Sequence, residues 1–167
     1  MQSKTKNIVL MGIFIALSLV GSYIKVPSPF QSIALDAMPA FLAGIILGGP
    51  QGAAIGFLGH LLTAANAGFY LTIPIHLLVA VIMAITIFVF STICQKTNVV
   101  FAGIVGIILN GVGAPLIMAF MPQFGWVFFT GITPFLVLAS AVNVIIAIAV
   151  AVVLQKSGFK GIDYVGR

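Results

Sequence analysis

The stretch that decides the fold runs from residue 73 to residue 93, IPIHLLVAVIMAITIFVFSTI, and it contains no charged side chain. A helix that crosses the hydrocarbon core of a bilayer needs about 20 mostly apolar residues. Pro74 is compatible with such a helix because it lies in the first turn, where its missing N–H costs nothing. The stretch therefore predicts a membrane-spanning helix.

The rest of the chain has the same character. Of its 167 residues 62% are hydrophobic, only 5% are charged, and two are acidic. The surface of a water-soluble domain needs far more charge, since about 25% of residues in soluble proteins are charged. Basic residues are also too few to form a nucleic-acid-binding face. We expect one membrane domain over residues 1–167, with no soluble catalytic domain.

Five further apolar segments are predicted helices, at residues 7–24, 36–47, 53–67, 99–120 and 130–154. Proline and glycine separate the first three segments, and residues 121–129 are predicted to be a loop. We therefore expect an all-α polytopic membrane protein, a bundle of six transmembrane helices. The segment 36–47 is short for a full crossing, so it is expected to be tilted or shielded by its neighbours.

Positive charge is distributed unevenly between the two sides of this six-helix arrangement. One side collects six basic residues and the other only Lys25; the six are Lys4, Lys6, Lys96, Lys156, Lys160 and Arg167. Cytoplasmic loops of membrane proteins carry the excess of Lys and Arg. Both termini are therefore predicted to be cytoplasmic.

The polar side chains gather in the outer half of the predicted bundle. Such an arrangement favours a ligand pocket that opens outward, because pockets are mostly apolar with a few placed polar groups. A continuous pore would need polar lining throughout. The candidate ligand-binding residues are Gln31, Asp36, Asn66, Tyr70, His76, Asn110 and Trp126.

Several of these candidates have a second interpretation. Asp36 could cap the N-terminus of the second helix, contact a ligand, or do both. Asn110 opens the sequence NGVGAP at residues 110–115, which predicts a kinked or broken helix beside a cavity, or it could tie two helices together. Tyr70 and Trp126 could stack on a flat ligand or belong to an aromatic belt at the membrane interface. Asn143 is expected to be structural.

Catalysis and metal binding have little support in the sequence. His60 and His76 are expected on different helices at different depths, with no second carboxylate or cysteine beside them. Zinc usually takes three or four protein ligands. The chain also lacks paired carboxylates and a phosphate-binding loop. We therefore expect no enzyme activity, no metal, and no cofactor or ATP bound by this chain itself.

Small residues recur four positions apart at Gly12 and Ala16, Gly44 and Gly48, and Gly52 and Gly56. This spacing lets helix backbones approach closely in lipid. Each pair could serve internal packing or could form a docking face for a partner membrane protein.

Five stretches together carry a resemblance to a known family: residues 13–25 (IFIALSLVGSYIK), 33–43 (IALDAMPAFLA), 48–53 (GGPQGA), 59–64 (GHLLTA) and 73–78 (IPIHLL). The chain resembles the S component, the substrate-binding membrane subunit, of energy-coupling factor (ECF) vitamin transporters. The last two stretches resemble the group associated with α-ribazole, a cobalamin precursor.

The resemblance implies a subunit of an ECF-type ABC importer in a bacterial cell membrane. It would capture a vitamin or precursor from outside and work with a transmembrane coupling subunit and two ATPases that use ATP. Gly12 and Ala16 match the positions that dock on the coupling subunit. Met1-Gln2-Ser3 lacks the Met-His ligands of metal-specific relatives. The alternatives are a stand-alone ion-coupled transporter and a structural membrane subunit without a ligand.

Overall fold

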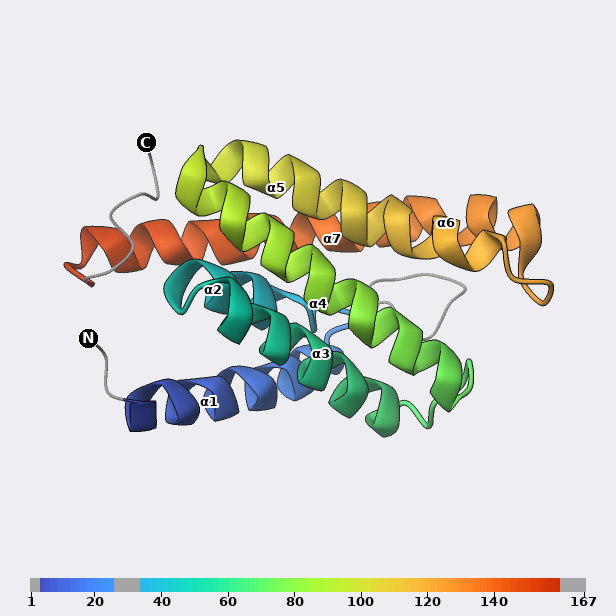
Figure 1. Cartoon of the computed structure of the whole chain (residues 1–167), viewed down its shortest axis with the longest axis horizontal. Coiled ribbons are helices and arrows are strands. Elements are labelled where there is room, and N and C mark those ends of the chain that lie inside the picture. Colours follow the sequence, from blue (N-terminus) through green and yellow to red (C-terminus); the bar gives the residue numbers. More distant parts are fainter. Residues whose placement is uncertain (1–3, 26–33, 160–167) are drawn as a thin grey trace.

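The computed structural model describes residues 4–25 and 34–159, and these residues form an all-helical structure (Figure 1). Six helical segments follow one another along the chain. They are α1 (Lys4–Ser22), α2 (Met38–Ile46), α3 (Gly49–Asn66), α4 (Ile73–Lys96), a continuous segment made of α5 (Val99–Ile108), the π-helix η1 (Leu109–Gly113) and α6 (Ala114–Ala119), and α7 (Gly125–Lys156). The all-α prediction is confirmed.

Four of these segments are long and apolar enough to cross a membrane: α1, α4, the segment Val99–Ala119, and α7. The 32-residue α7 extends over most of the length of the molecule in Figure 1. Helix α2 has nine residues, which at 1.5 Å per residue is about 13 Å, less than half of a bilayer core of about 30 Å.

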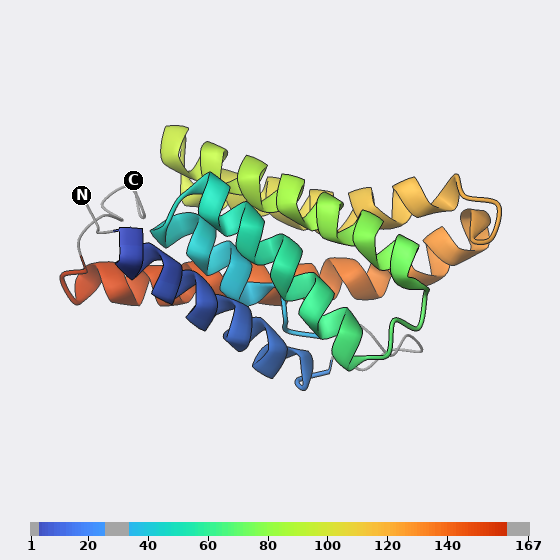
Figure 2. The same cartoon turned by 60° about the horizontal axis from the view of Figure 1, so that its bottom comes forward.

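Helix α2 forms the centre of the apolar core. It packs against α1, α3, α4 and α7, and Figure 2 shows α1 as the outermost helix on the side turned forward there. Seven of the nine α2 residues are buried, and the ring of Phe41 meets that of Phe90 on α4 edge to face at 5.0 Å. The expectation that this short segment is shielded by its neighbours is confirmed.

The small-residue pairs have two different surroundings. A Cβ atom on Gly52 would lie 2.7 Å from Cα of Gly44, so α2 and α3 touch through their backbones, and a Cβ on Gly56 would meet Ile87 at 3.0 Å. These glycines serve internal packing. Gly12 has nothing within 4 Å of such a Cβ atom, and both Gly12 and Ala16 are exposed on α1.

One boundary prediction needs correction, and the helix predicted to be kinked or broken at Asn110 is not broken. Residues 125–129 were expected in a loop, yet α7 begins at Gly125 and continues through Gly131 and Pro134. Around Asn110 the helix is distorted rather than broken: the two glycines of η1 allow a π-helical turn, and Pro115 begins a new α-helical turn.

Candidate ligand-binding site

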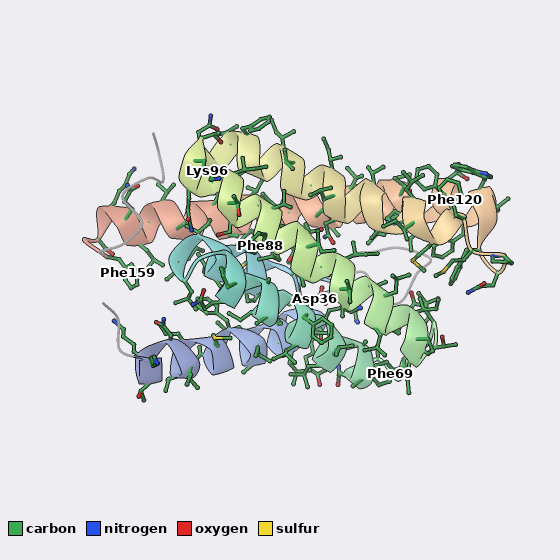
Figure 3. All side chains as sticks on the ribbon, viewed as in Figure 1. Asp36, Phe69, Phe88, Lys96, Phe120 and Phe159 are labelled. Carbon is green, nitrogen blue, oxygen red and sulfur yellow. The ribbon has the colours of Figure 1, made fainter. Side chains whose placement is uncertain are left out.

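A cavity of about 100 Å³ lies between α4, α6 and α7, beside the N-terminus of α2. It is mostly apolar, and its polar groups come from separate elements. The lining consists of Ala34, Asp36, Ala37, His60, Tyr70, Leu71, His76, Val79, Met83, Asn110, Ala114, Pro115, Met118, Phe128, Ile132, Leu136, Ala139, Ser140 and Asn143. Asp36 lies near the middle of the molecule in Figure 3. An apolar cavity with a few convergent polar groups is the usual form of a small-molecule site.

Helix α7 contributes one side of the cavity through a single stripe of its surface. Phe128, Ile132, Leu136, Ser140 and Asn143 all line the cavity, and they follow the spacing of three or four residues that places side chains on one helix face. The stripe starts within the segment expected to be a loop. Of the α7 lining, only Phe128 lay outside the predicted helix, which began at residue 130.

Asp36 accepts a hydrogen bond from a neighbouring helix. The hydroxyl of Thr63 on α3 donates to Oδ2 of Asp36 at 2.9 Å. The interpretation of Asp36 as the helix cap is wrong, because the N-cap position of α2 is Ala37 and no side chain of that residue caps the helix. The carboxylate therefore faces α3 and the cavity instead of the first turn of α2.

Asn143 supplies the cap that Asp36 does not. Its Oδ1 accepts the backbone N–H of Met38, the first residue of α2, at 2.6 Å, and its Nδ2 donates to the carbonyl of Ala34 at 3.2 Å. Nδ2 also contacts the carbonyl of Ala139 at 2.8 Å. One buried amide on α7 thus fixes both the start of α2 and the segment that carries Asp36. The expectation that Asn143 is structural is confirmed.

His60 and His76 form a pair at the edge of the cavity. Nδ1 of His76 lies 3.3 Å from Nε2 of His60, so one imidazole donates to the other. The expectation that the two rings lie at different depths is wrong, because the antiparallel hairpin of α3 and α4 brings both to one level. Nε2 of His76 is buried and has no hydrogen-bond partner among the described residues. Buried polar atoms without a partner are rare and call for an explanation such as a ligand.

Asn110 occupies the π-helical turn and points toward α7. Its Nδ2 donates to Oγ of Ser140 at 2.8 Å. This bond ties η1 to α7, and both residues line the cavity. The two interpretations of Asn110, as cavity lining and as a tie between helices, therefore both describe its position. Within residues 4–25 and 34–159 no group of three metal-ligating side chains comes together.

The structure brings four of the seven predicted binding residues into the lining: Asp36, Tyr70, His76 and Asn110. Asn66 lies elsewhere and accepts the hydroxyl of Tyr23 at 3.0 Å. Trp126 is 57% exposed and packs against Phe120 and Phe129 at the far end of the α6–α7 hairpin. Gln31 lies outside the described residues. The binding role of all seven stays a prediction.

His60 and Ser140 were missing from the predicted site. The signal for His60 is its place on α3, facing His76 across the tight hairpin to α4, and that pairing depends on hairpin geometry. The signal for Ser140 is its spacing of four from Leu136 on the α7 stripe. Neither residue type alone distinguishes a lining position from a packed one.

Comparisons with known proteins agree on the kind of protein that contains this cavity. A solved chain, described with the structure and mechanism of the S component of a bacterial ECF transporter, matches with a TM-score of 0.77 over 93% of this chain and 98% of that chain. The two sequences are 18% identical, so this likeness shows the fold.

A curated relative, the probable biotin transporter BioY of Lysinibacillus sphaericus, is 41% identical over 51 residues. The match spans 30% of this chain and 26% of the relative, about a quarter of that protein's length.

The family model described as "ECF transporter, substrate-specific component" matches residues 6–162, nearly the whole chain. The apolar helices fit a multi-pass membrane protein. The chain belongs to the family of substrate-specific S components of ECF transporters.

Proposed function

We propose that this chain captures a vitamin or vitamin precursor from outside the cell in the cavity between α4, α6 and α7. The observation that carries the proposal is the convergence of Asp36, His76 and Asn110, from three separate elements, on one mostly apolar cavity. Such groups fix the orientation of a ligand, while the apolar stripe of α7 contributes contact area. The loop that carries Tyr70 would close over the bound molecule, and Gln31 stays a predicted contact outside the described residues.

Two ligands are candidates. Biotin is suggested by the name of the curated relative, although the shared region is short. α-Ribazole is suggested by the resemblance of residues 59–64 and 73–78 to the group associated with that precursor. Calorimetry in detergent with each compound distinguishes them, and mass spectrometry of small molecules that copurify with the protein tests for any other ligand.

Import requires partners beyond this chain. We propose that it forms one transmembrane domain, crosses the membrane six times, and hands its ligand inward with a transmembrane coupling subunit and two ATPases. The exposed Gly12 and Ala16 on α1 support a docking face there, since nothing in the described chain covers them. ATP is used by the partners. Copurification with ATPases supports this assembly, whereas ligand flux in liposomes with this chain alone would favour an ion-coupled transporter.

Both termini are proposed to be cytoplasmic. The first residue of α1, Lys4, and the last residues of α4 and α7, Lys96 and Lys156, all lie toward one end of the molecule (Figures 1 and 3). In a Cys94→Ser background, cysteines at positions 96 and 123 are treated with an impermeant thiol reagent in intact cells. We expect labelling at position 123 only. Labelling from outside at position 96 contradicts the cytoplasmic assignment.

Two substitutions test the cavity as the binding site. Asp36→Asn keeps the shape and an acceptor for Thr63 but removes the charge, and His76→Ala removes the unpartnered Nε2. A buried polar group that loses its partner costs about 1–3 kcal/mol. We therefore expect affinity for the identified ligand to fall about five- to a hundredfold in each variant, measured by calorimetry.

Asn66→Ala is the control for these two variants. It removes a polar side chain of α3 that lies outside the cavity lining and, among the described residues, accepts a hydrogen bond from Tyr23. Its ligand affinity should equal that of the wild type. If both Asp36→Asn and His76→Ala keep wild-type affinity and thermal stability, these two side chains do not bind the ligand and serve packing instead.

A further inference from the structure

The carboxylate of Asp36 brings hydrogen-bonding capacity to the cavity that is purely that of an acceptor. The side-chain amide of Asn143 is already bonded: its oxygen accepts from Met38 and its nitrogen donates to the carbonyls of Ala34 and Ala139. The hydroxyl of Thr63 donates to Asp36. A carboxylate offers about four acceptor sites, and Thr63 uses one of them on Oδ2 of Asp36. Among the described residues, Thr63 is the side chain that donates to this carboxylate.

Asn110 adds a second acceptor across the cavity. One N–H of its Nδ2 is used by Ser140, which leaves Oδ1 as an acceptor and the second N–H as a donor. Asn110 comes from η1 and Asp36 from the segment before α2, so the two acceptors approach the cavity from different elements. A molecule that satisfies both must carry hydrogen-bond donors at two places.

The described lining of the cavity contains no lysine or arginine. Asp36 is the only formally charged residue in its described lining. Segment 26–33, VPSPFQSI, which lies outside the described residues, contains no charged residue either. Lys25 lines a smaller adjoining cavity of about 20 Å³ and not the larger one. The other basic residues lie in the sequence at positions 4, 6, 96, 156, 160 and 167, at or beyond the ends of α1, α4 and α7.

We propose that the part of the ligand that enters this cavity is a neutral or cationic group rich in N–H donors, and that anionic groups stay outside it. This rests on the proposed function, since it assumes that the cavity is the ligand site. A buried charge without a partner is costly, and an anion next to Asp36 would meet a like charge in a poorly screened environment. An N–H donor or a cation instead forms a charge-assisted hydrogen bond with the carboxylate.

The consequence for a ligand such as biotin is a fixed orientation. The ureido ring of biotin carries N–H donors and no charge, whereas its side chain ends in a carboxylate. The ring would occupy the cavity, and the carboxylate would point toward Lys25 or the exterior. A ligand with a phosphate or carboxylate on its ring would be rejected.

Three probes of nearly equal shape test the inference: 5-amidinobenzimidazole, benzimidazole-5-carboxamide and benzimidazole-5-carboxylate. They share one flat skeleton and differ in the charge of one substituent. With the full-length protein in detergent, calorimetry is expected to show that the amidine and the carboxamide bind at least tenfold more tightly than the carboxylate. Equal or tighter binding of the carboxylate, or no binding of the other two, overturns the inference.

Two variants assign the preference to named atoms. Asp36→Asn should remove most of the preference for amidine over carboxylate, and Asn110→Asp should increase it, because it adds a second carboxylate at the opposite wall. Asn98→Asp is the matched control: it adds the same charge at the N-cap of α5, where an aspartate still caps the N–H of Phe101. An unchanged preference in Asp36→Asn, or an equal increase in Asn98→Asp, overturns the assignment.

Uptake assays separate this inference from the proposed function. If cells import a vitamin through the chain and its coupling subunits while the carboxylate probe binds as well as the amidine, the proposed function stands and the charge rule fails. If the preference exists and disappears in Asp36→Asn but no vitamin is imported, the charge rule stands and the role in import fails.

Discussion

Replacing Asn143 with leucine is expected to lower the free energy of unfolding by about 2–6 kcal/mol, although the two side chains are similar in size. The N–H of Met38 and the carbonyl of Ala34 both lose their partner. Each buried backbone group left unpaired costs about 1–3 kcal/mol. The carbonyl of Ala139 is unaffected as it retains its bond within α7. Thermal and denaturant unfolding in detergent measure the effect.

Asn7→Leu provides a matched control on α1. Oδ1 of Asn7 is buried and has no hydrogen-bond partner among the described residues, so removing this amide should leave stability unchanged or raise it. Asn143→Leu should also weaken ligand binding, because the segment that carries Asp36 loses an anchor. A stability within 0.5 kcal/mol of the wild type, a range usual for neutral surface substitutions, would show that Asn143 does not hold the start of α2.

Leucine at both Gly12 and Ala16 is expected to abolish uptake while ligand affinity stays at the wild-type level. A side chain at Gly12 meets nothing within 4 Å in this chain, so the fold can accept the added bulk. A partner helix packed on these small residues could not, because close backbone approach depends on their size. Uptake by cells that also produce the coupling subunits measures the first effect, and calorimetry of the isolated chain measures the second.

Two control variants accompany this experiment, one expected to be neutral and one expected to disrupt the fold. Ala149→Leu adds the same bulk to an exposed position of α7 and should leave uptake unchanged. Gly52→Leu places a side chain against Gly44 at the contact between α2 and α3 and should prevent folding. If the α1 double variant loses ligand binding and folding together, as Gly52→Leu should, this face of α1 packs inside the molecule and the docking interpretation is wrong.

The helices could be predicted because each depends on a local property of the chain. Long apolar runs such as residues 73–93 are recognisable by composition, and the segment 36–47 was predicted to be short for a full crossing and shielded by its neighbours. The boundaries were less predictable. At residues 121–129 proline, glycine and aromatic residues indicate a loop, yet helix α7 begins at Gly125 and packs against α6.

Part of the site could be predicted because polar residues are rare in the apolar segments of this chain, and such residues often have a functional role. Asp36, His76 and Asn110 were found in this way, and all three line the cavity. Depth along a helix could not separate Asn66 from them, since lining depends on which way a side chain faces as well as on its height. The sequence also indicated Asp36 as the cap of α2, whereas the structure uses Asn143. Asn143 lies 105 positions from Met38, and rules based on neighbouring residues cannot detect such a pair.

The π-helical turn sets the rotational phase of one cavity wall. In an α-helix each residue advances the direction of the side chains by about 100°, so positions spaced strictly by four drift around the axis. Asn110, Ala114 and Met118 are spaced by four and all line the cavity, and the π-helical turn η1 lies at the start of this run. A π-helical turn holds one residue more than an α-helical turn, because its hydrogen bonds join residues five apart. Deleting one residue between Leu109 and Gly113 would therefore restore a regular helix and leave α6 facing the cavity nearly as before. A deletion within α5 or α6 would instead rotate the helix beyond it by about 100°, so this turn is the place in the cavity wall where a residue can be removed with the least change in the side chains that face the ligand.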